Sequence, residues 1–230
     1  LYGNSIVALE LTTGKVKWHF QHVRHDIWDF DTPAQPILFE WKKNGENIPA
    51  VAQLTKQGFV FVFNRLTGEP LWEITEMPVP PSQVEGEKTA ATQPKPIAPP
   101  PLIDSFLLPK DAWGLTPFDK SDCEDQLREV NNLGLFTPNS EKLSLMYPGS
   151  LGGPNWGGGA LLGDKGILLV NINNVAFTGQ LTKKDTGDGA SSKADHPKSG
   201  QRMKVPMKGT PYTMEIGALQ SFLGINVGDP

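Results

Sequence analysis

The sequence has a single cysteine, Cys123, and no long apolar run. One cysteine excludes an intrachain disulfide and a metal cluster built from cysteines. The apolar stretches are only a few residues long, so hydropathy predicts neither a membrane-spanning helix nor a signal peptide. Basic residues are also few, with 21 Lys and Arg against 25 Asp and Glu and a net charge of −4. This charge gives no support to nucleic-acid binding, which normally needs a basic face.

Glycine and proline are abundant instead, with 24 and 21 residues among 230, while 38% of the residues are hydrophobic. This composition suits short strands joined by many turns better than a helical protein. The length allows one large domain or two small ones. Because the chain starts at Leu1 and stops at Pro230 without a stop signal, we expect a piece of a longer protein. The missing signal peptide therefore says nothing about the compartment.

Two segments of the chain follow the same pattern of strand, tight turn and strand. Residues 6–18 and 59–72 each contain Thr-Gly at the turn, and each closes on a tryptophan, Trp18 or Trp72. The two tryptophans are 54 residues apart, as are the two Thr-Gly pairs. An internal repeat of hairpins with this period indicates the blades of a β-propeller. The alternative is two hairpins that resemble each other by coincidence.

The stretch His25–Asp31 gathers three carboxylates, an imidazole and an indole in seven residues, just before a proline-rich turn. If the segment is extended, alternation places Asp29 and Asp31 on one face and Trp28 and Phe30 on the other. Acids on one side and aromatics on the other suit the wall of a site for a flat, polar ligand. The simpler interpretation is a hydrogen-bonded corner with no binding role.

Lys56 follows a predicted strand over residues 48–54. A lysine in a turn between strands is usually solvated. Here we expect the strand to lie beside the one that carries Asp29, so the cation and this carboxylate would share a site. A glycine-rich stretch, residues 147–159, lacks the spacing and the Lys-Ser/Thr of a phosphate-binding loop, and no helix follows it. Asn171 lies within the next predicted strand, where a polar amide should have a partner.

Three further segments complete the predicted organisation. The proline-rich residues 77–101 form an insertion that crosses one propeller face rather than a blade. Residues 119–133 predict a helix, with Asp119 or Ser121 as its cap and Gly134 after its end. The polar residues 182–202 predict a mobile loop.

Several of these motifs resemble the pyrroloquinoline quinone (PQQ) dehydrogenases, and among them the branch of membrane-bound glucose and quinate dehydrogenases. The strongest is the His-Asp-x-Trp-Asp-x-Asp string at 25–31, followed by Pro-Ala-Gln-Pro at 33–36. Further matching stretches, in the same order as in the family, lie at residues 14–21, 55–62, 111–119 and 148–158. The similarity covers nearly all of the chain except 182–202.

The resemblance implies an all-β fold, in which residues 1–230 form a partial β-propeller of about three to four blades out of eight. It also implies PQQ on the propeller axis with a Ca²⁺ or Mg²⁺ ion beside it. The family's catalytic aspartate matches Asp29, its lysine at the quinone oxygens matches Lys56, and its cofactor-contacting asparagine matches Asn171. Asp31 matches a position that binds a lanthanide in some alcohol-oxidising relatives, a role not assumed here. Most metal ligands, and hence the metal site, are expected outside the chain.

For the full-length protein, the resemblance implies oxidation of a sugar or polyol, with glucose as the first expectation and quinate or shikimate as the alternative. Electrons would pass to ubiquinone, on the periplasmic side of a bacterial inner membrane, with membrane segments outside this chain. A non-catalytic propeller that binds proteins is the alternative from another class, since the fold alone does not decide function. The trio of Asp29, Lys56 and Asn171 favours the enzyme. We expect the isolated chain to be inactive and to bind PQQ weakly at best.

Overall fold

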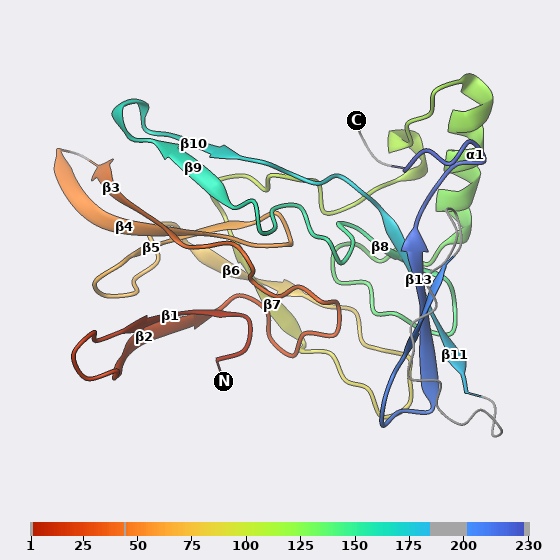
Figure 1. Ribbon diagram of the computed structural model, residues 1–230, viewed down its shortest axis with the longest axis horizontal. Helices are drawn as coiled ribbons and strands as arrows, with labels where there is room; N and C mark the ends of the chain where they lie inside the picture. Colours follow the sequence, from red (N-terminus) through yellow and green to blue (C-terminus); the bar gives the residue numbers. More distant parts are fainter. Residues whose placement is uncertain (1, 44, 185–201, 228–230) are drawn as a thin grey trace. The chain divides into compact units, whose positions relative to one another are not determined.

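Short antiparallel strands make up most of the regular structure, as the glycine and proline content predicts. The computed structural model describes residues 2–43, 45–184 and 202–227. The chain divides into two units (Figure 1). The first unit comprises Leu1–Val79, Ala90–Asp104 and Leu151–Asn173, and the second comprises Pro80–Thr89, Ser105–Ser150 and Asn174–Pro230.

The first unit contains four small antiparallel sheets. They are β1 (Ser5–Leu9) with β2 (Val16–Gln21), β3 (Ile37–Lys43) with β4 (Glu46–Leu54) and β5 (Val60–Asn64), β6 (Ile74–Pro78) with β7 (Thr92–Pro96), and β9 (Gly159–Leu162) with β10 (Ile167–Val170). The turn between β9 and β10 contains a short 3₁₀ helix, η2 (Gly163–Lys165). In Figure 1 the β9–β10 hairpin lies along β3, with which it makes contacts.

The first predicted hairpin is present as β1 and β2. In the second, the chain after β5 turns back at Thr-Gly but pairs only through an isolated bridge between Phe63 and Pro70, so its second strand does not form. The tryptophan of the first hairpin packs on the turn of the second repeat. The indole N–H of Trp18 donates to the carbonyl of Arg65 at 3.0 Å. A Cβ added to Gly68, the glycine of the second Thr-Gly pair, would lie 2.6 Å from Cγ of Trp18. The glycine therefore makes room for the ring that joins one repeat to the next.

Strands β4 and β5 form the core of the first unit because both faces of their sheet are covered. One face is aliphatic, and its buried members belong to a cluster of Ala34, Ala50, Ala52, Leu54, Val60 and Val62. Leu168 and Val170 of β10 pack against this cluster. The other face is aromatic: the rings of Phe61 and Phe63 contact Phe20, and Phe61 also contacts His22. Burial lowers the pKa of His22 to about 3, so this imidazole is neutral.

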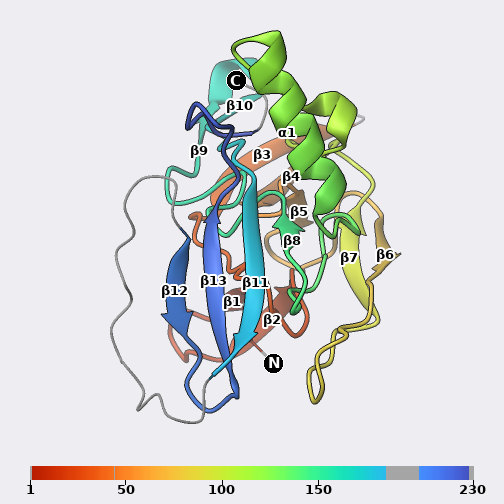
Figure 2. The same cartoon turned by 90° about the vertical axis from the view of Figure 1, so that its right-hand side faces the viewer.

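The second unit is built on one four-stranded antiparallel sheet. Its strands follow the order β12 (Met203–Pro206), β13 (Tyr212–Ala218), β11 (Phe177–Lys183) and β8 (Ser144–Met146), as Figure 2 shows. It also contains the 3₁₀ helix η1 (Pro109–Asp111) and the helix α1 (Pro117–Glu129). Within the described ranges, no helix is both long and apolar enough to cross a membrane.

The predicted helix exists, but it begins and ends earlier than expected. Thr116 caps α1 by accepting a hydrogen bond from the Asp119 N–H, and Pro117 occupies the first turn. A threonine cap followed by proline is a strong start signal, and it precedes the expected caps, Asp119 and Ser121. The helix ends at Glu129, so Gly134 is not its C-terminal cap. The Gln126 side chain then donates to the carbonyl of Gln220, which ties α1 to the segment after β13.

The proline-rich segment at 77–101 contains strand β7, which pairs with β6 in a two-stranded sheet. Both strands have free edges, where proline is tolerated. That this segment crosses one propeller face stays a prediction. Of the predicted loop 182–202, residues 185–201 lie outside the described residues, and 182–183 are the end of β11.

Candidate active site

The stretch His25–Asp31 forms a bent loop rather than a straight extended segment. His25 and Asp29 have φ values of 47° and 65°, in the left-handed region that non-glycine residues rarely adopt. The Asp26 carboxylate accepts a hydrogen bond from the Trp28 N–H at 2.9 Å and another from the Asn4 side chain at 2.8 Å. These bonds hold a backbone conformation that costs about 1–2 kcal/mol per left-handed residue.

The predicted division of the side chains between two faces is confirmed in this bent loop. Trp28 and Phe30 are each 2% exposed, and their rings stack with centroids 6.4 Å apart. Asp29 and Asp31 lie on the other side, where both carboxylates form ion pairs with one lysine. The aromatic pair thus anchors the loop in the unit and presents the acids together.

That lysine is Lys56, in the turn that follows β4, and it is buried with an exposure of 5%. Its ammonium group forms a hydrogen-bonded ion pair with the Asp31 carboxylate and donates to the Asp29 carbonyl at 2.9 Å. The Asp29 carboxylate lies further away, with Oδ2 3.5 Å from Nζ. Lys56 and Asp29 therefore lie close together, as predicted, although Asp29 belongs to a loop and not to a strand beside β4. That they form a functional site stays a prediction. The expectation that such a lysine is usually solvated does not apply here.

Asp29 is the exposed member of this cluster, with 68% of its side-chain surface accessible. Partial burial raises the pKa of the Asp29 carboxyl above its ordinary value, and the negative charges of Asp31 and Asp26 add to the rise. The nearby Lys56 ammonium opposes it. A carboxylate with a raised pKa and an open side is suited to accept a proton from a ligand, because its proton affinity is closer to that of a general base.

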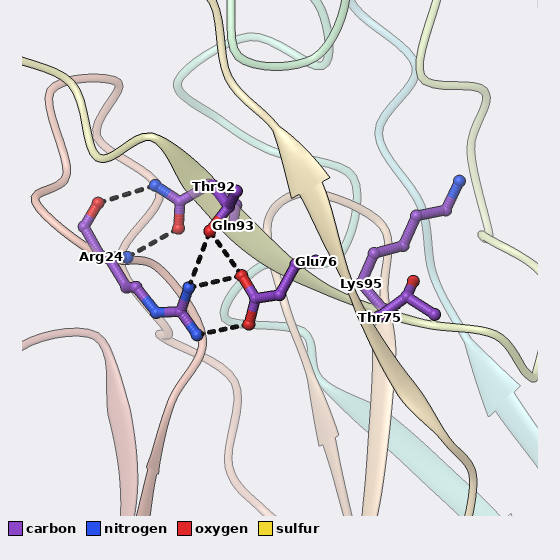
Figure 3. Close-up of polar contacts among 6 residues, drawn as sticks. All are labelled: Arg24, Thr75, Glu76, Thr92, Gln93 and Lys95. Carbon is purple, nitrogen blue, oxygen red and sulfur yellow. Dashed lines mark hydrogen bonds and ion pairs between the residues drawn. The ribbon is translucent and has the colours of Figure 1, made fainter.

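A side-chain clamp fixes the backbone immediately before this loop (Figure 3). Gln93 of β7 is fully buried, and its amide forms two hydrogen bonds with the main chain of Arg24, accepting from N–H at 2.8 Å and donating to C=O at 2.7 Å. A buried amide that hydrogen-bonds both the N–H and the C=O of one residue takes the place of the two hydrogen bonds that a neighbouring strand would make. Gln93 therefore ties the start of the loop to the β6–β7 hairpin.

The Arg24 side chain adds a second, more exposed connection to the same hairpin. Its guanidinium binds both oxygens of Glu76, at 2.6 and 2.7 Å, and Thr92 donates to the same carboxylate at 2.6 Å (Figure 3). These hydrogen bonds lower the pKa of Glu76 to about 2. Since the side chains of Arg24 and Glu76 are 40% and 50% exposed, the pair contributes less than the buried amide of Gln93 does.

Asn171 does not lie within a strand, contrary to the prediction, because β10 ends at Val170. It is exposed, and its amide lies beside the backbone of Gly157. The neighbouring asparagines are engaged: Asn173 donates to the carbonyl of Gly153, and Asn174 accepts from the Tyr147 hydroxyl. Of these three asparagines, Asn171 is the one whose amide is open to a ligand.

The glycine-rich stretch meets both Lys56 and Asn171. The Gly153 N–H donates to the Lys56 carbonyl at 2.8 Å, and a Cβ on Gly152 would lie 2.8 Å from Cα of Lys56. Gly157 abuts the end of the Asn171 side chain. Gly152 and Gly157 are five residues apart, which is at most about 18 Å of extended chain. Lys56 and Asn171 therefore contact the same loop at points no further apart than this.

Sequence reasoning missed several residues of the site. Asp31 is a main partner of Lys56 although it was assigned no role, and Gln93 and Asn4 hold the loop from distant parts of the chain. No local pattern marks these two amides. Among the residues that the structure describes, no group of three His, Cys, Asp or Glu side chains could hold a metal ion.

Comparison with known protein families matches residues 1–230 to one family, the glucose/ethanol/alcohol dehydrogenase β-propeller domain that binds PQQ. The whole chain is 38% identical to the quinate/shikimate dehydrogenase (quinone) of Acinetobacter baylyi and 37% identical to quinoprotein glucose dehydrogenase A of Acinetobacter calcoaceticus, and it covers 29% of each. It is 33% identical to the quinoprotein glucose dehydrogenase of Escherichia coli, again over 29% of that protein.

Solved structures support the fold. A europium-containing methanol dehydrogenase superposes on 97% of this chain with a TM-score of 0.52 at 18% identity, and 29% of that enzyme is covered. The quinohemoprotein alcohol dehydrogenase of Comamonas testosteroni matches 96% of this chain with a TM-score of 0.50 at 23% identity, and 26% of it is covered. The strands are thus part of a β-propeller. The chain belongs to the PQQ-dependent dehydrogenase family.

Proposed function

We propose that the chain carries part of the active site of a full-length PQQ-dependent dehydrogenase that oxidises a hydroxyl group of a sugar or polyol. The proposal concerns a longer protein because the chain spans 29% of its curated relatives. The observation that carries it is the buried Lys56 ammonium beside two carboxylates, one of which, Asp29, is open and has a raised pKa. A binding scaffold has no need for this arrangement.

The residues present fit PQQ by their chemistry. An ortho-quinone with carboxylate groups offers hydrogen-bond acceptors and negative charge, so it needs donors and a cation. Lys56 supplies an ammonium group, and the amide of Asn171 supplies two N–H donors that are open to a ligand. The Gly157 backbone beside this amide leaves space that a side chain would fill.

The proposed reaction divides between Asp29 and Lys56. PQQ, when bound, supplies the quinone that accepts hydride from the substrate carbon. Asp29 accepts the hydroxyl proton on its carboxylate, which is accessible and only loosely paired with Lys56 at 3.5 Å. Lys56 retains its bonds to Asp31 and to the Asp29 carbonyl, and its third N–H turns toward the negative charge that develops in the transition state.

Ca²⁺ or Mg²⁺ remains part of the proposal through the family resemblance alone. The described residues offer two carboxylates at this point, Asp29 and Asp31, and both pair with Lys56. Two paired carboxylates are a poor ligand set for a divalent ion, which takes six or more oxygen ligands. No step of the mechanism is therefore assigned to the metal.

The substrate is proposed as glucose, with quinate or shikimate as the second candidate. The quinate/shikimate dehydrogenase and glucose dehydrogenase A are nearly equal in identity to the chain, at 38% and 37%, so identity does not separate the two substrates. The quinate relative carries "quinone" in its name. This name supports a respiratory quinone, such as ubiquinone, as the electron acceptor, and with it a place on the periplasmic side of a bacterial membrane, anchored by segments outside this chain.

Dye-linked oxidation by the full-length protein tests the proposal. The protein is reconstituted with PQQ and Ca²⁺ and offered glucose and quinate in parallel. Turnover that requires PQQ and prefers one of them supports the class and identifies the branch. If PQQ binds but neither compound is oxidised, the substrate is another alcohol. A failure to bind PQQ would favour the alternative of a protein-binding propeller.

The isolated chain is expected to show no turnover and weak PQQ binding at best. It spans less than a third of the relatives, so most of the surface that would surround the cofactor is contributed by other residues. The same assay on the 230-residue chain checks this expectation.

A further inference from the structure

Gly157 has no backbone reason to be glycine. Its φ value is not in the left-handed region, in contrast to Gly158, which has a φ of 57°. A Cβ on Gly158 would meet nothing within 4 Å, whereas a Cβ on Gly157 would lie 2.8 Å from Nδ2 and 2.9 Å from Cγ of Asn171. Adjacent glycines therefore serve different purposes: Gly158 allows a conformation, and Gly157 leaves room for one amide.

The Asn171 amide needs such a neighbour because little else fixes it. The residue lies past the end of β10 and is exposed, and no hydrogen bond from its side chain to a described residue is seen. The amide of Asn173, by comparison, is held by the carbonyl of Gly153 at 3.3 Å. The contact with the Gly157 backbone is thus what limits the positions that the Asn171 amide can take.

We propose that Gly157 is a positioning residue for cofactor binding, because its missing side chain sets where the Asn171 amide can present its donors. The inference rests on the proposed function, in which this amide binds PQQ. It goes beyond that function by assigning a role to a residue that does not itself offer a side chain to the cofactor. Replacing Gly157 with alanine pushes the amide away while Asn171 remains in the sequence.

The substitution should leave the fold intact. The atoms that the new methyl group would meet are at the end of a flexible, exposed side chain, which can rotate away at small cost. Gly163→Ala is the matched control, because a Cβ at Gly163 would meet nothing within 4 Å and its φ is not in the left-handed region. Gly163 lies in the β9–β10 turn, and it makes no contact proposed for the cofactor.

The test is a double-mutant cycle on PQQ affinity in the full-length protein. The apo forms of the wild type, Gly157→Ala, Asn171→Ala, the double variant and Gly163→Ala are titrated with PQQ, followed by tryptophan fluorescence and by the absorption spectrum of the bound cofactor. A neutral hydrogen bond contributes about 0.5–1.5 kcal/mol, so Gly157→Ala and Asn171→Ala should each weaken binding about 2–10-fold. The double variant should bind like Asn171→Ala alone, and Gly163→Ala like the wild type.

The cycle separates the inference from the function on which it rests. If Asn171→Ala leaves PQQ affinity unchanged, the proposed role of Asn171 is wrong, and the role of Gly157 falls with it. If Asn171→Ala weakens binding but Gly157→Ala does not, the positioning role alone is overturned. Gly157→Ala could also weaken PQQ binding equally in the wild type and in the Asn171→Ala background. The positioning role would then be overturned, because the effect of Gly157 would not act through Asn171. Thermal unfolding of the same five apo proteins checks that folding is preserved.

Discussion

Two irregular stretches of the first unit contact Lys56, and they are built from opposite kinds of residue. The loop at 25–31 uses large side chains: buried aromatics anchor it, and Asp29 and Asp31 pair with the ammonium group. The glycine-rich stretch uses missing side chains, so that its backbone lies against Lys56 at Gly152 and against Asn171 at Gly157.

The difference shows two ways of holding a reactive group in place. The acidic side chains in the first loop act by charge and hydrogen bonding, so altering them should change chemistry more than stability. Glycines in the second stretch act by shape. A side chain added to one of them should therefore displace the neighbouring residue, Lys56 or Asn171. Substitutions in and beside each stretch test this difference.

Replacing Lys56 with alanine should have the largest effect on PQQ affinity. In the proposed site, removal of the cation takes away a charge-assisted hydrogen bond to the cofactor, worth about 1.5–3 kcal/mol, so PQQ affinity should fall by about 10- to 150-fold. Turnover should fall by about 10²–10³-fold, because one donor to developing charge is lost. Cofactor titration and dye-linked kinetics of the full-length protein measure both. Lys42→Ala, which alters an exposed lysine of β3, is the control and should behave as the wild type.

Gly152→Ala should destabilise the fold itself. Gly152 has a φ of 69°, and its added Cβ would lie 2.5 Å from Cβ and 2.8 Å from Cα of Lys56. A left-handed alanine costs about 1–2 kcal/mol, and the overlap with backbone adds about 1–3 kcal/mol. Urea unfolding should show a loss of about 2–5 kcal/mol. Gly163→Ala serves as the comparison, and a loss no larger than its own would contradict the close packing on Lys56.

Gln93→Leu should cost more than Glu76→Gln, although Glu76 makes the ion pair. Leucine leaves the N–H and C=O of Arg24 without their buried partner, at about 1–3 kcal/mol. Glu76→Gln weakens an exposed pair, at about 1 kcal/mol or less. Urea unfolding gives the order, and salt should reduce the effect of Glu76→Gln only. The reverse order would show that the side chain of Arg24, not its backbone, anchors the loop.

The pH dependence of kcat/KM should show the smallest of these effects. As the proposed base, Asp29 must be deprotonated, and its pKa is raised, so activity should fall as the pH drops through a value above that of an ordinary aspartate. Asp31→Asn removes one charge that raises the pKa of Asp29, and it also leaves Lys56 freer to lower it. The acidic limb of the profile should therefore move to lower pH. A shift to higher pH would contradict the assignment of Asp29.

Much of this architecture follows from local sequence patterns. The Thr-Gly turns and the tryptophans at 18 and 72 predicted the first hairpin and the turn of the second repeat, because such turns need glycine and a ring needs room to pack. The alternation from Trp28 to Asp31 predicted which side chains are buried even though the backbone is bent. Its place in an apolar predicted strand drew attention to Asn171, but only the family resemblance gave it a role at the cofactor.

The remainder depends on contacts between distant parts of the chain. Gln93 reaches Arg24 across 69 residues, and Asn4 reaches Asp26 across 22. Nothing in the residues beside these amides reveals their partners. The predicted start of the helix was wrong for a different reason. The acidic residues after Ser121 were given more weight than the stronger start signal of Thr116 and Pro117. The strand end at Val170 was missed because Ile172, two residues beyond it, extends the apolar pattern.

Turnover of Asp29→Asn in the PQQ-loaded full-length protein tests the proposed base directly. Asparagine keeps the shape of the side chain and removes the base. We predict that kcat falls by about 10²–10⁴-fold while the absorption spectrum and the affinity of bound PQQ stay those of the wild type. Normal turnover in this variant would contradict the central claim that Asp29 accepts the substrate proton beside Lys56.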